Sequence, residues 1–199
     1  MDDCNRCPAL AANRRCIVHG YGPAPARVLF VGEAPGTHGA DQTGVPFTRD
    51  RSGKRLQQVL IDLGLSSETD PRAEHPQLQC YVTNVVRCNP PANRRPMPAE
   101  IAACLPALWS DLAAVQPEFV IPVGGLAWQV IGHALLGRPV PPITRVHAQA
   151  WPIDTAGGSG PRLIVPMRHP ARISNAGLSQ FVAVMSELLE PVPRTAEHS

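Results

Sequence analysis

The sequence predicts an α/β fold, a three-layer sandwich around a central four-stranded, mainly parallel sheet. Short runs rich in β-branched and aromatic residues read as buried strands. Longer segments carry apolar residues at the i, i+3, i+4, i+7 spacing of amphipathic helices. The two kinds of segment alternate along the chain, which is typical of a parallel sheet covered by helices.

The expected strands are short apolar runs. RVLFV, between Pro25 and Gly32, is the clearest of them, and CYVTNVV, FVIPVG and RLIVPM are the others. A hairpin is also expected around ITRVHAQAW, within an irregular stretch over 138–160. The predicted strand ranges are 27–31, 80–86, 119–124 and 162–167.

The expected helices have recognisable ends. Ser52 can cap a helix over 53–63, and Gly64 can end it. Pro98 suits the first turn of the next helix, which Pro106 should kink. The remaining helices are expected over 125–137 and 178–190, within a single domain over 1–190 that is followed by a flexible tail over 191–199.

Composition sets limits on the class of protein. The 199 residues suit one domain, and neither a membrane-spanning run nor a signal pattern in MDDCNRC is visible, so a cytoplasmic monomer is expected. The net charge of +2 says little, but Lys54 is the only lysine among 18 basic residues. Arginine suits phosphate and base recognition, although a GC-rich genome would also favour it.

Unusual chemistry follows the expected strands. GEAPG comes after the first strand, Thr83-Asn84 ends the second, and Arg168-His169-Pro170 follows the fourth. Because ligands of parallel α/β sheets bind beyond the carboxyl ends of the strands, these loops are expected to form the functional site.

A stacking ring, an amide and an imidazole stand in these loops. Phe47 offers an aromatic face, Asn84 a donor and an acceptor, and His169 a single N–H donor. Together they suit a flat heterocycle such as a nucleobase. Taken singly, each has a plainer explanation: a satellite core phenylalanine, a strand-ending asparagine and a surface histidine.

The cysteines suggest a metal site. In a cytoplasmic chain, six cysteines are better explained as metal ligands or buried apolar residues than as disulfides. Cys4 and Cys7 form a CxxC pair, which needs two further thiolates to complete a tetrahedral site.

The ordered motifs resemble the family-four uracil-DNA glycosylases, which carry an iron–sulfur cluster. The motifs are GEAPG, GVPF, TNVVRCNPPANRRP, EIAACLPAL and HP, and the resemblance extends from Cys4 to about Arg172. It implies a four-stranded parallel sheet, a DNA-facing groove at its carboxyl end, and excision of a flipped-out uracil that leaves an abasic site.

The same resemblance implies roles for individual residues. His169 would donate to uracil O2, Asn84 would read N3–H and O4, and Phe47 would stack on the ring, while Gly32 and Glu33 would line the uracil site. Glu33 would act on the sugar side with a water molecule, although loop capping is an alternative for its carboxylate. The ligands of a [4Fe–4S] cluster would be Cys4, Cys7, Cys88 and Cys104, with a zinc site of the same residues as the alternative.

The loop over 37–52 departs from the family pattern. An extra residue precedes Asp41, and the expected glutamate is replaced by Gly39 or Ala40, which bears on discrimination against thymine. Thr48-Arg49 replaces the expected Val-Gly. Phosphate contacts are expected from arginines in or beside the loops, namely Arg87, Arg94, Arg95, Arg168 and Arg172.

Three functional hypotheses follow from these motifs. The first is a monofunctional uracil-DNA glycosylase that acts on single- or double-stranded DNA. The second is a glycosylase with an altered base preference, because of the changed loop. The third is an iron–sulfur protein that binds DNA lesions without cleaving them. A redox or zinc module is a weaker fourth, since the CxxC lacks a thioredoxin-like context.

Overall fold

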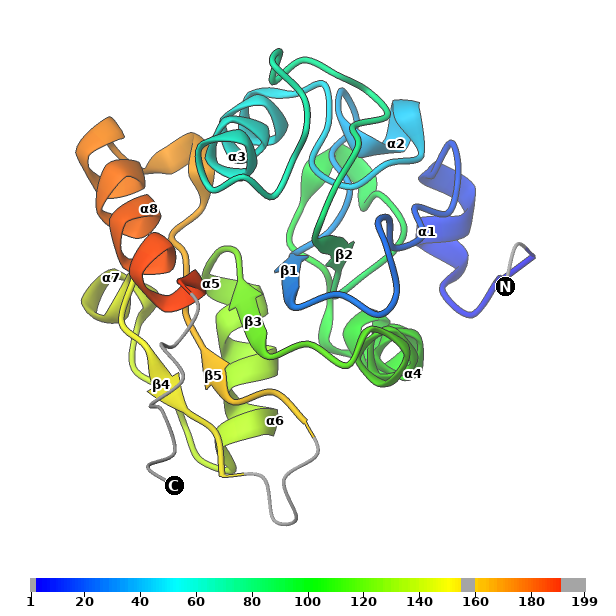
Figure 1. The fold of residues 1–199 in the computed structure, drawn as a ribbon. Coiled ribbons are helices and arrows are strands. Elements are labelled where there is room, and N and C mark those ends of the chain that lie inside the picture. Colours follow the sequence, from blue (N-terminus) through cyan, green and yellow to red (C-terminus); the bar gives the residue numbers. More distant parts are fainter. Residues whose placement is uncertain (1–2, 155–159, 191–199) are drawn as a thin grey trace, which may run out of the picture.

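The computed structural model describes residues 3–154 and 160–190 and contains a five-stranded sheet. The strand order is β2-β1-β3-β5-β4, and every pair is parallel except β4 with β5. Within this order lie all the strands that the sequence predicted, which confirms the α/β sandwich (Figure 1). The strands are β1 (Val28–Gly32), β2 (Tyr81–Asn84), β3 (Phe119–Pro122), β4 (Trp151–Pro152) and β5 (Leu163–Ile164).

The fifth strand corrects the predicted strand count and the predicted hairpin. Residues Ile143–Val146 form a helical turn, α7, instead of a strand. Trp151 then pairs with Ile164 of β5, as an antiparallel edge. The apolar alternation over 143–151 is therefore divided between one helical turn and an edge strand that pairs far along the chain.

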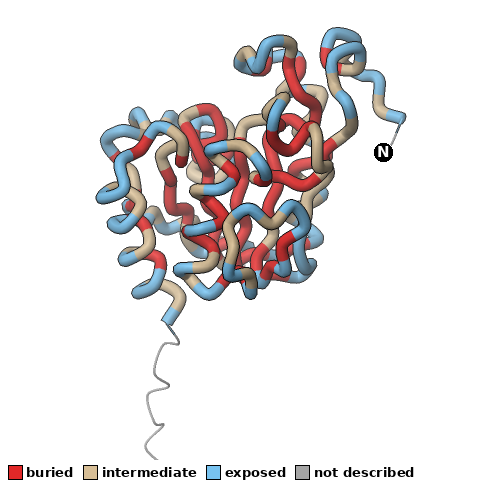
Figure 2. Tube along the Cα trace, turned by 90° about the horizontal axis from the view of Figure 1, so that it is seen from above, coloured by how far each residue is buried: buried red, intermediate tan, exposed pale blue. Residues whose placement is uncertain are grey.

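Alternating side chains of β1 build two apolar cores. Phe30 lies in the core that includes Leu56 of α3 (Arg51–Asp62) and Phe181 of α8 (Asn175–Leu189). Leu29 lies in the other core, with Leu108 of α4 (Pro98–Val115) and Trp128 of the helical segment after β3. The helices therefore cover both faces of the sheet, and buried residues concentrate in the interior (Figures 1 and 2).

The predicted helices are present with shifted ends. Asp50, and not Ser52, caps α3, because its Oδ1 accepts both the Gly53 N–H and the Ser52 hydroxyl at 2.7 Å. The helix from Pro98 continues through Pro106, which lies on its exposed side. The helical elements are α1 (Pro8–Asn13), α2 (Ala40–Thr43), α3 (Arg51–Asp62), η1 (Pro91–Asn93), α4 (Pro98–Val115), α5 (Gly125–Ala127), the π-helix η2 (Trp128–Gly132), α6 (His133–Leu136), α7 (Ile143–Val146), η3 (Pro170–Arg172) and α8 (Asn175–Leu189).

Two further expectations concern regions away from the sheet. None of the helices in the described part of the chain has the length and apolar character of a membrane span. The predicted tail over 191–199 lies outside the described residues.

Candidate functional site

The sheet brings the predicted loops together at one end. Gly32 pairs with Asn84 at the ends of β1 and β2, and its carbonyl accepts the N–H of Val85 at 2.9 Å. On the other side of β1, the Gly124 N–H donates to Met167 at 2.8 Å, two residues before His169. The GEAPG loop, the end of β2 and the HP loop therefore leave the same edge of the sheet, as the sequence predicted.

The structure gathers the three predicted base-binding side chains around one recess. Phe47, Asn84 and His169 all line an inner pocket of about 50 Å³, together with Glu33. Gly32 makes room for two of them, because a Cβ there would overlap the Asn84 side-chain oxygen and would lie 2.5 Å from Cζ of Phe47. The three side chains that the sequence singled out therefore line the same recess.

Phe47 is held in an unusual backbone conformation. Its φ of 56° lies in the left-handed region, which is costly for an aromatic residue. The buried Gln57 donates to the Phe47 carbonyl at 3.1 Å, and Gly53 allows the start of α3 to approach this backbone closely. Helix α3 thus fixes the ring over Gly32.

His169 is oriented as a donor through Nε2. Its Nδ1 accepts the Ala171 N–H at 3.3 Å, which leaves Nε2 to carry the proton of the neutral ring. Burial lowers the pKa of His169, and Arg172 lowers it further, while Asp50 acts in the opposite direction. Burial and Arg172 therefore favour the neutral ring, and within the described residues its Nε2 has no backbone partner.

Glu33 is half-buried at the junction of two cavities. It lines the inner pocket and also an outer groove of about 450 Å³. Burial raises the pKa of Glu33, whereas Arg95 and Arg172 lower it. A carboxylate with a raised pKa beside a recess is the kind of group that active sites retain although its burial costs stability.

The outer groove and the inner pocket share a wall. Asp50, which the sequence did not single out, lines both the groove and the pocket. Its Oδ1 caps α3, and its Oδ2 lies toward Gly36 and Gly39. A planar base could enter from the groove and place its edge in the recess. The groove is lined by Glu33, Ala34, Pro35, Gly36, Thr37, His38, Asp50, Arg51, Ser52, Pro90, Asn93, Arg94, Gly124, Gly125, His169, Ala171 and Arg172.

A buried amide that the sequence did not reveal fixes the GEAPG loop. Asn89 donates to the Pro35 carbonyl at 2.7 Å and to Oδ1 of Asn93 at 2.9 Å. The Thr37 hydroxyl and the side-chain amide of Asn13 both donate to Oδ1 of Asn89, at 3.0 and 2.9 Å. The side chain of Asn89 thereby ties α1, the GEAPG loop and the 88–93 loop together.

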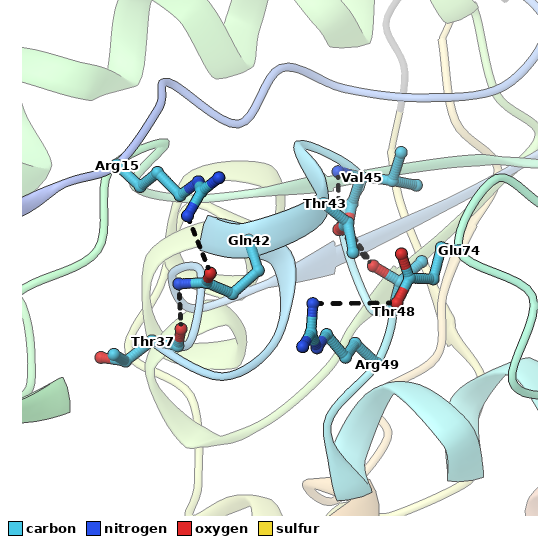
Figure 3. Close-up of polar contacts among 8 residues, drawn as sticks. All are labelled: Arg15, Thr37, Gln42, Thr43, Val45, Thr48, Arg49 and Glu74. Atoms are coloured by element: carbon cyan, nitrogen blue, oxygen red, sulfur yellow. Dashed lines mark hydrogen bonds and ion pairs between the residues drawn. The ribbon is translucent and has the colours of Figure 1, made fainter.

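The divergent 37–52 loop is anchored internally at its first half. Gln42 accepts a hydrogen bond from Arg15 at 3.3 Å and donates to the Thr37 carbonyl at 2.8 Å (Figure 3). The buried Asp41 carboxylate accepts the Arg15 N–H at 3.0 and 3.2 Å. Asp41 is therefore structural, whereas Ala40 lines the inner pocket.

The second half of this loop binds its new side chains to other groups of the protein, although Thr48 also lines the recess. The Thr48 hydroxyl is buried and donates to the Val45 carbonyl at 2.8 Å, and it shares a 2.6 Å hydrogen bond with Thr43. Arg49 lies 3.9 Å from Glu74 (Figure 3). Thr48 thus stabilises the loop, while Arg49 lies on the exposed surface.

Arg87 corrects the expected set of phosphate contacts. Its side chain is only 7% exposed, pairs with Asp111 at 2.7 Å and donates to the Ala107 carbonyl at 3.1 Å. Both partners belong to α4, so the guanidinium is directed toward this helix and is not available to a phosphate.

The other arginines differ in how far they are engaged. Arg94 forms a two-point ion pair with Glu100, at 2.6 and 2.8 Å, but still lines the groove. Arg95 is exposed and donates to Gln129 at 2.7 Å. Arg172 is exposed at the groove, and the backbone N–H of Arg168 donates to His147 at 3.1 Å.

The four predicted cysteine ligands gather in one region. Burial raises the pKa of Cys7, Cys88 and Cys104, and Cys4 raises each of them further, which places all four within electrostatic reach. Arg14 donates to the Cys88 sulfur at 3.6 Å, and the Arg87 N–H donates to the Cys104 sulfur at 3.4 Å. Within 3–154 and 160–190, however, no group of three or more His, Cys, Asp or Glu side chains is arranged as a ligand set.

The chemistry of this region nevertheless fits a thiolate-bound cluster. Iron–sulfur clusters take four cysteine ligands, and hydrogen bonds to their sulfurs tune them. Cys16 and Cys80 lie outside the group: Cys80 is fully buried, and burial raises its pKa to about 12. Cys80 matches the predicted role of a small apolar residue, whereas Cys16 is half-buried and its thiol donates to the Asp41 carbonyl at 3.6 Å.

Comparison with known proteins places the chain in a family. A model of the uracil DNA glycosylase superfamily matches residues 19–190. A type-4 uracil-DNA glycosylase of Thermotoga maritima is 33% identical over 187 residues, which cover 94% of this chain and 86% of the relative. One from Archaeoglobus fulgidus is 32% identical over 85% of this chain and 77% of its own length.

A type-5 enzyme shows that the similarity reaches beyond one branch. The type-5 uracil-DNA glycosylase of Pyrobaculum aerophilum is 35% identical over 65% of each chain. The type-4 relatives match over more of the chain than this one does. The chain therefore belongs to the uracil DNA glycosylase superfamily and, within it, to family four.

Proposed function

We propose that the protein is a monofunctional uracil-DNA glycosylase of base excision repair. The observation that carries the proposal is the convergence of Phe47, Asn84, His169 and Glu33 on one recess that opens into a groove. A duplex hides the N-glycosidic bond, so the target nucleotide must first be extruded into this recess. The inner pocket and the adjoining part of the groove would together hold the base.

Two side chains would recognise the base. Phe47 would stack on the ring, which contributes roughly 1–3 kcal/mol per base in other nucleic-acid complexes. The Asn84 amide would accept from N3–H and donate to O4. Cytosine presents the opposite donor and acceptor at these positions, so the same amide would discriminate against it.

His169 would stabilise the leaving group. As the N-glycosidic bond breaks, negative charge develops on uracil, and the Nε2–H of a neutral imidazole can donate to O2. The Ala171 N–H, by occupying Nδ1, keeps that proton on Nε2. Comparable donors in other enzymes contribute roughly 3–4 kcal/mol to transition-state stabilisation.

Glu33 would act at the sugar. The sugar becomes oxocarbenium-like in glycoside hydrolysis, and a carboxylate there both favours the cation and orients the attacking water. Its place between pocket and groove suits this role. No lysine is available in these loops for an imine, which supports hydrolysis without a lyase step.

The cofactor that we infer is a [4Fe–4S] cluster held by Cys4, Cys7, Cys88 and Cys104. When bound, it would serve structurally, by linking the N-terminal segment to the loop after β2 and to α4. Support comes from the convergence of the thiols and from the donors to the Cys88 and Cys104 sulfurs. Iron and acid-labile sulfide in roughly equal amounts would support it, and zinc without sulfide would refute it.

DNA would be held by arginines that line the groove or lie beside it. We infer this role for Arg94, Arg95, Arg168 and Arg172, with the protein acting as a monomer. The affinity for DNA should then fall steeply with salt.

A second candidate is a glycosylase with a wider base preference. Ala40 forms part of the pocket wall in the divergent loop, and its side chain is small. A 5-substituted pyrimidine or another damaged base would meet less obstruction there than opposite a longer side chain.

The deciding experiment is base release from a panel of oligonucleotides. Single- and double-stranded DNA containing uracil, thymine, 5-hydroxymethyluracil or hypoxanthine would be incubated with the protein and then treated with alkali to cleave abasic sites. We expect release of uracil, and little release by His169→Ala and Asn84→Ala. Release only of other bases would favour the second candidate, and lesion binding without any release would favour a non-catalytic role.

A further inference from the structure

The backbone on both sides of His169 is held by side chains from two other parts of the chain. Arg55 comes from α3, and His147 follows α7. Neither residue lies in the motifs that predicted the site. Their contacts fall on Arg168 and Pro170, the two neighbours of His169, and on the segment that follows.

Arg55 binds the HP loop from the side of α3. One guanidinium nitrogen donates to the carbonyls of Pro170 and Ile173, at 2.6 and 2.7 Å, and the other donates to the Asn175 side chain at 2.7 Å. Hydrogen bonds from a charged donor are stronger than neutral ones. Arg55 therefore joins the helix that carries the Phe47 loop to the loop that carries His169.

His147 binds the same loop from a different part of the chain. Its Nε2 lies 2.9 Å from the Gly177 carbonyl, and its Nδ1 lies 3.1 Å from the backbone nitrogen of Arg168. Because a carbonyl only accepts, Nε2 must carry the proton, and Nδ1 is left to accept the Arg168 N–H. The ring stacks on Phe181 of α8 at 6.1 Å between centroids, which fixes its plane.

This arrangement requires a neutral His147. Protonation would put an N–H on Nδ1, facing the N–H of Arg168. Burial lowers the pKa of His147, and the charge of Arg168 lowers it further. Its other neighbours on α8 and after β5 are the apolar Phe181 and the Gly177 and Pro166 carbonyls.

We propose that Arg55 and His147 are positioning residues, which fix the backbone around His169 so that its Nε2–H points at the leaving base. The inference rests on the proposed function. The ring orientation of His169 depends on the Ala171 N–H, and Ala171 lies in the segment that Arg55 and His147 hold. A displacement of about 1 Å at a catalytic group can lower a rate by roughly 100-fold.

A matched pair of substitutions separates positioning from bulk packing. His147→Asn retains an acceptor at the place of Nδ1 and loses the contact with Gly177. His147→Gln retains a donor at the place of Nε2 and loses the acceptor for Arg168. We expect His147→Gln to lower the single-turnover rate of uracil release by roughly 10- to 100-fold, and His147→Asn by no more than about threefold.

A double-mutant cycle tests whether the effect passes through the imidazole of His169. In a His169→Ala background, His147→Gln and Arg55→Gln should change the residual rate by no more than about twofold, because the group that they position is gone. Equal losses in His147→Asn and His147→Gln, or additive losses in the cycle, would overturn the proposal. The Tm of each variant, compared with that of the wild type, identifies rate losses that come from a less stable fold.

A spectroscopic measurement keeps the test independent of activity. Imidazole ¹⁵N spectra of the wild-type protein should show His147 and His169 each as the neutral Nε2–H tautomer, and His147→Gln should broaden or shift the His169 signals. Unchanged His169 signals in a folded His147→Gln variant would refute positioning. A wild-type protein with these tautomers and no uracil release would instead refute the proposed function.

Discussion

Replacing Gly32 by alanine is the sharpest test of the base pocket. Gly32 ends β1, and its backbone lies outside the left-handed region that would exclude a side chain. Its carbonyl accepts the N–H of Val85, just after β2, and a Cβ would not disturb that bond. The new methyl group would nevertheless overlap the Asn84 side-chain oxygen and would lie 2.5 Å from Cζ and 3.1 Å from Cε1 of Phe47. Both base-recognition groups would have to move.

The expected loss follows from the two interactions. Stacking contributes roughly 1–3 kcal/mol and an amide hydrogen bond about 1 kcal/mol, so their displacement should cost about 2–4 kcal/mol. That corresponds to a decrease in kcat/KM of about 30- to 1,000-fold. The assay is uracil release from a duplex, together with the affinity for abasic-site DNA, which lacks the base and should change little.

Gly125→Ala provides the matched control. A Cβ at Gly125 meets only Ile143, at 3.9 Å, and this backbone also lies outside the left-handed region. Although Gly125 lines the groove, the kcat/KM of this variant should fall far less than that of Gly32→Ala. The reasoning would be wrong if Gly32→Ala kept its activity within about threefold, or if it lost abasic-site affinity in proportion to its rate.

Three further outcomes test the rest of the site. Because burial raises the pKa of Glu33, the folded state holds that proton more tightly than the unfolded chain does. Glu33→Gln should therefore raise Tm at neutral pH, where the wild-type carboxylate is charged. This gain in Tm should disappear below the ordinary glutamate pKa, where the wild-type carboxyl is protonated. Uracil release should fall under both conditions. Arg87→Ala should cost about 1.5–3 kcal/mol in urea unfolding, since it removes the charged hydrogen bond to Asp111 and leaves the Thr83 hydroxyl as a donor to that carboxylate. Arg172→Ala should instead reduce the salt slope of DNA binding by about 0.9 with stability unchanged. Asn89→Ala should lower kcat roughly 10-fold or more, because the GEAPG loop loses the hydrogen bond to its Pro35 carbonyl. The measurement is the rate of uracil release at saturating substrate.

The elements that the sequence predicted well are those whose signal is local. Apolar runs such as RVLFV became buried strands, and the loops after them met at one edge because parallel strands must end together. The placement of Phe47, Asn84 and His169 in one recess follows from that topology. The edge strand β4 was missed because two residues, one of them proline, carry no recognisable pattern.

The features that were missed depend on partners distant in the sequence. The sequence around Arg87 does not indicate that its guanidinium forms an ion pair with Asp111 of α4. Asn89 likewise gains its role only when Pro35 and Asn13 come within hydrogen-bond distance. Asp50 took the cap from Ser52 because its carboxylate accepts two donors at once.

Several departures from ordinary stability rules lie at this edge of the sheet. Phe47 adopts a left-handed backbone, and burial shifts the pKa of Glu33 and of His169 toward their uncharged forms. Each feature costs stability and persists only if surrounding contacts determine it. Those contacts are present: Gln57 holds the Phe47 carbonyl, and Arg55 holds the loop of His169. Gln57 and Arg55 both belong to α3, so the contacts of this helix also maintain the shape of the pocket. Substitutions on its inner face should therefore impair catalysis before they unfold the protein.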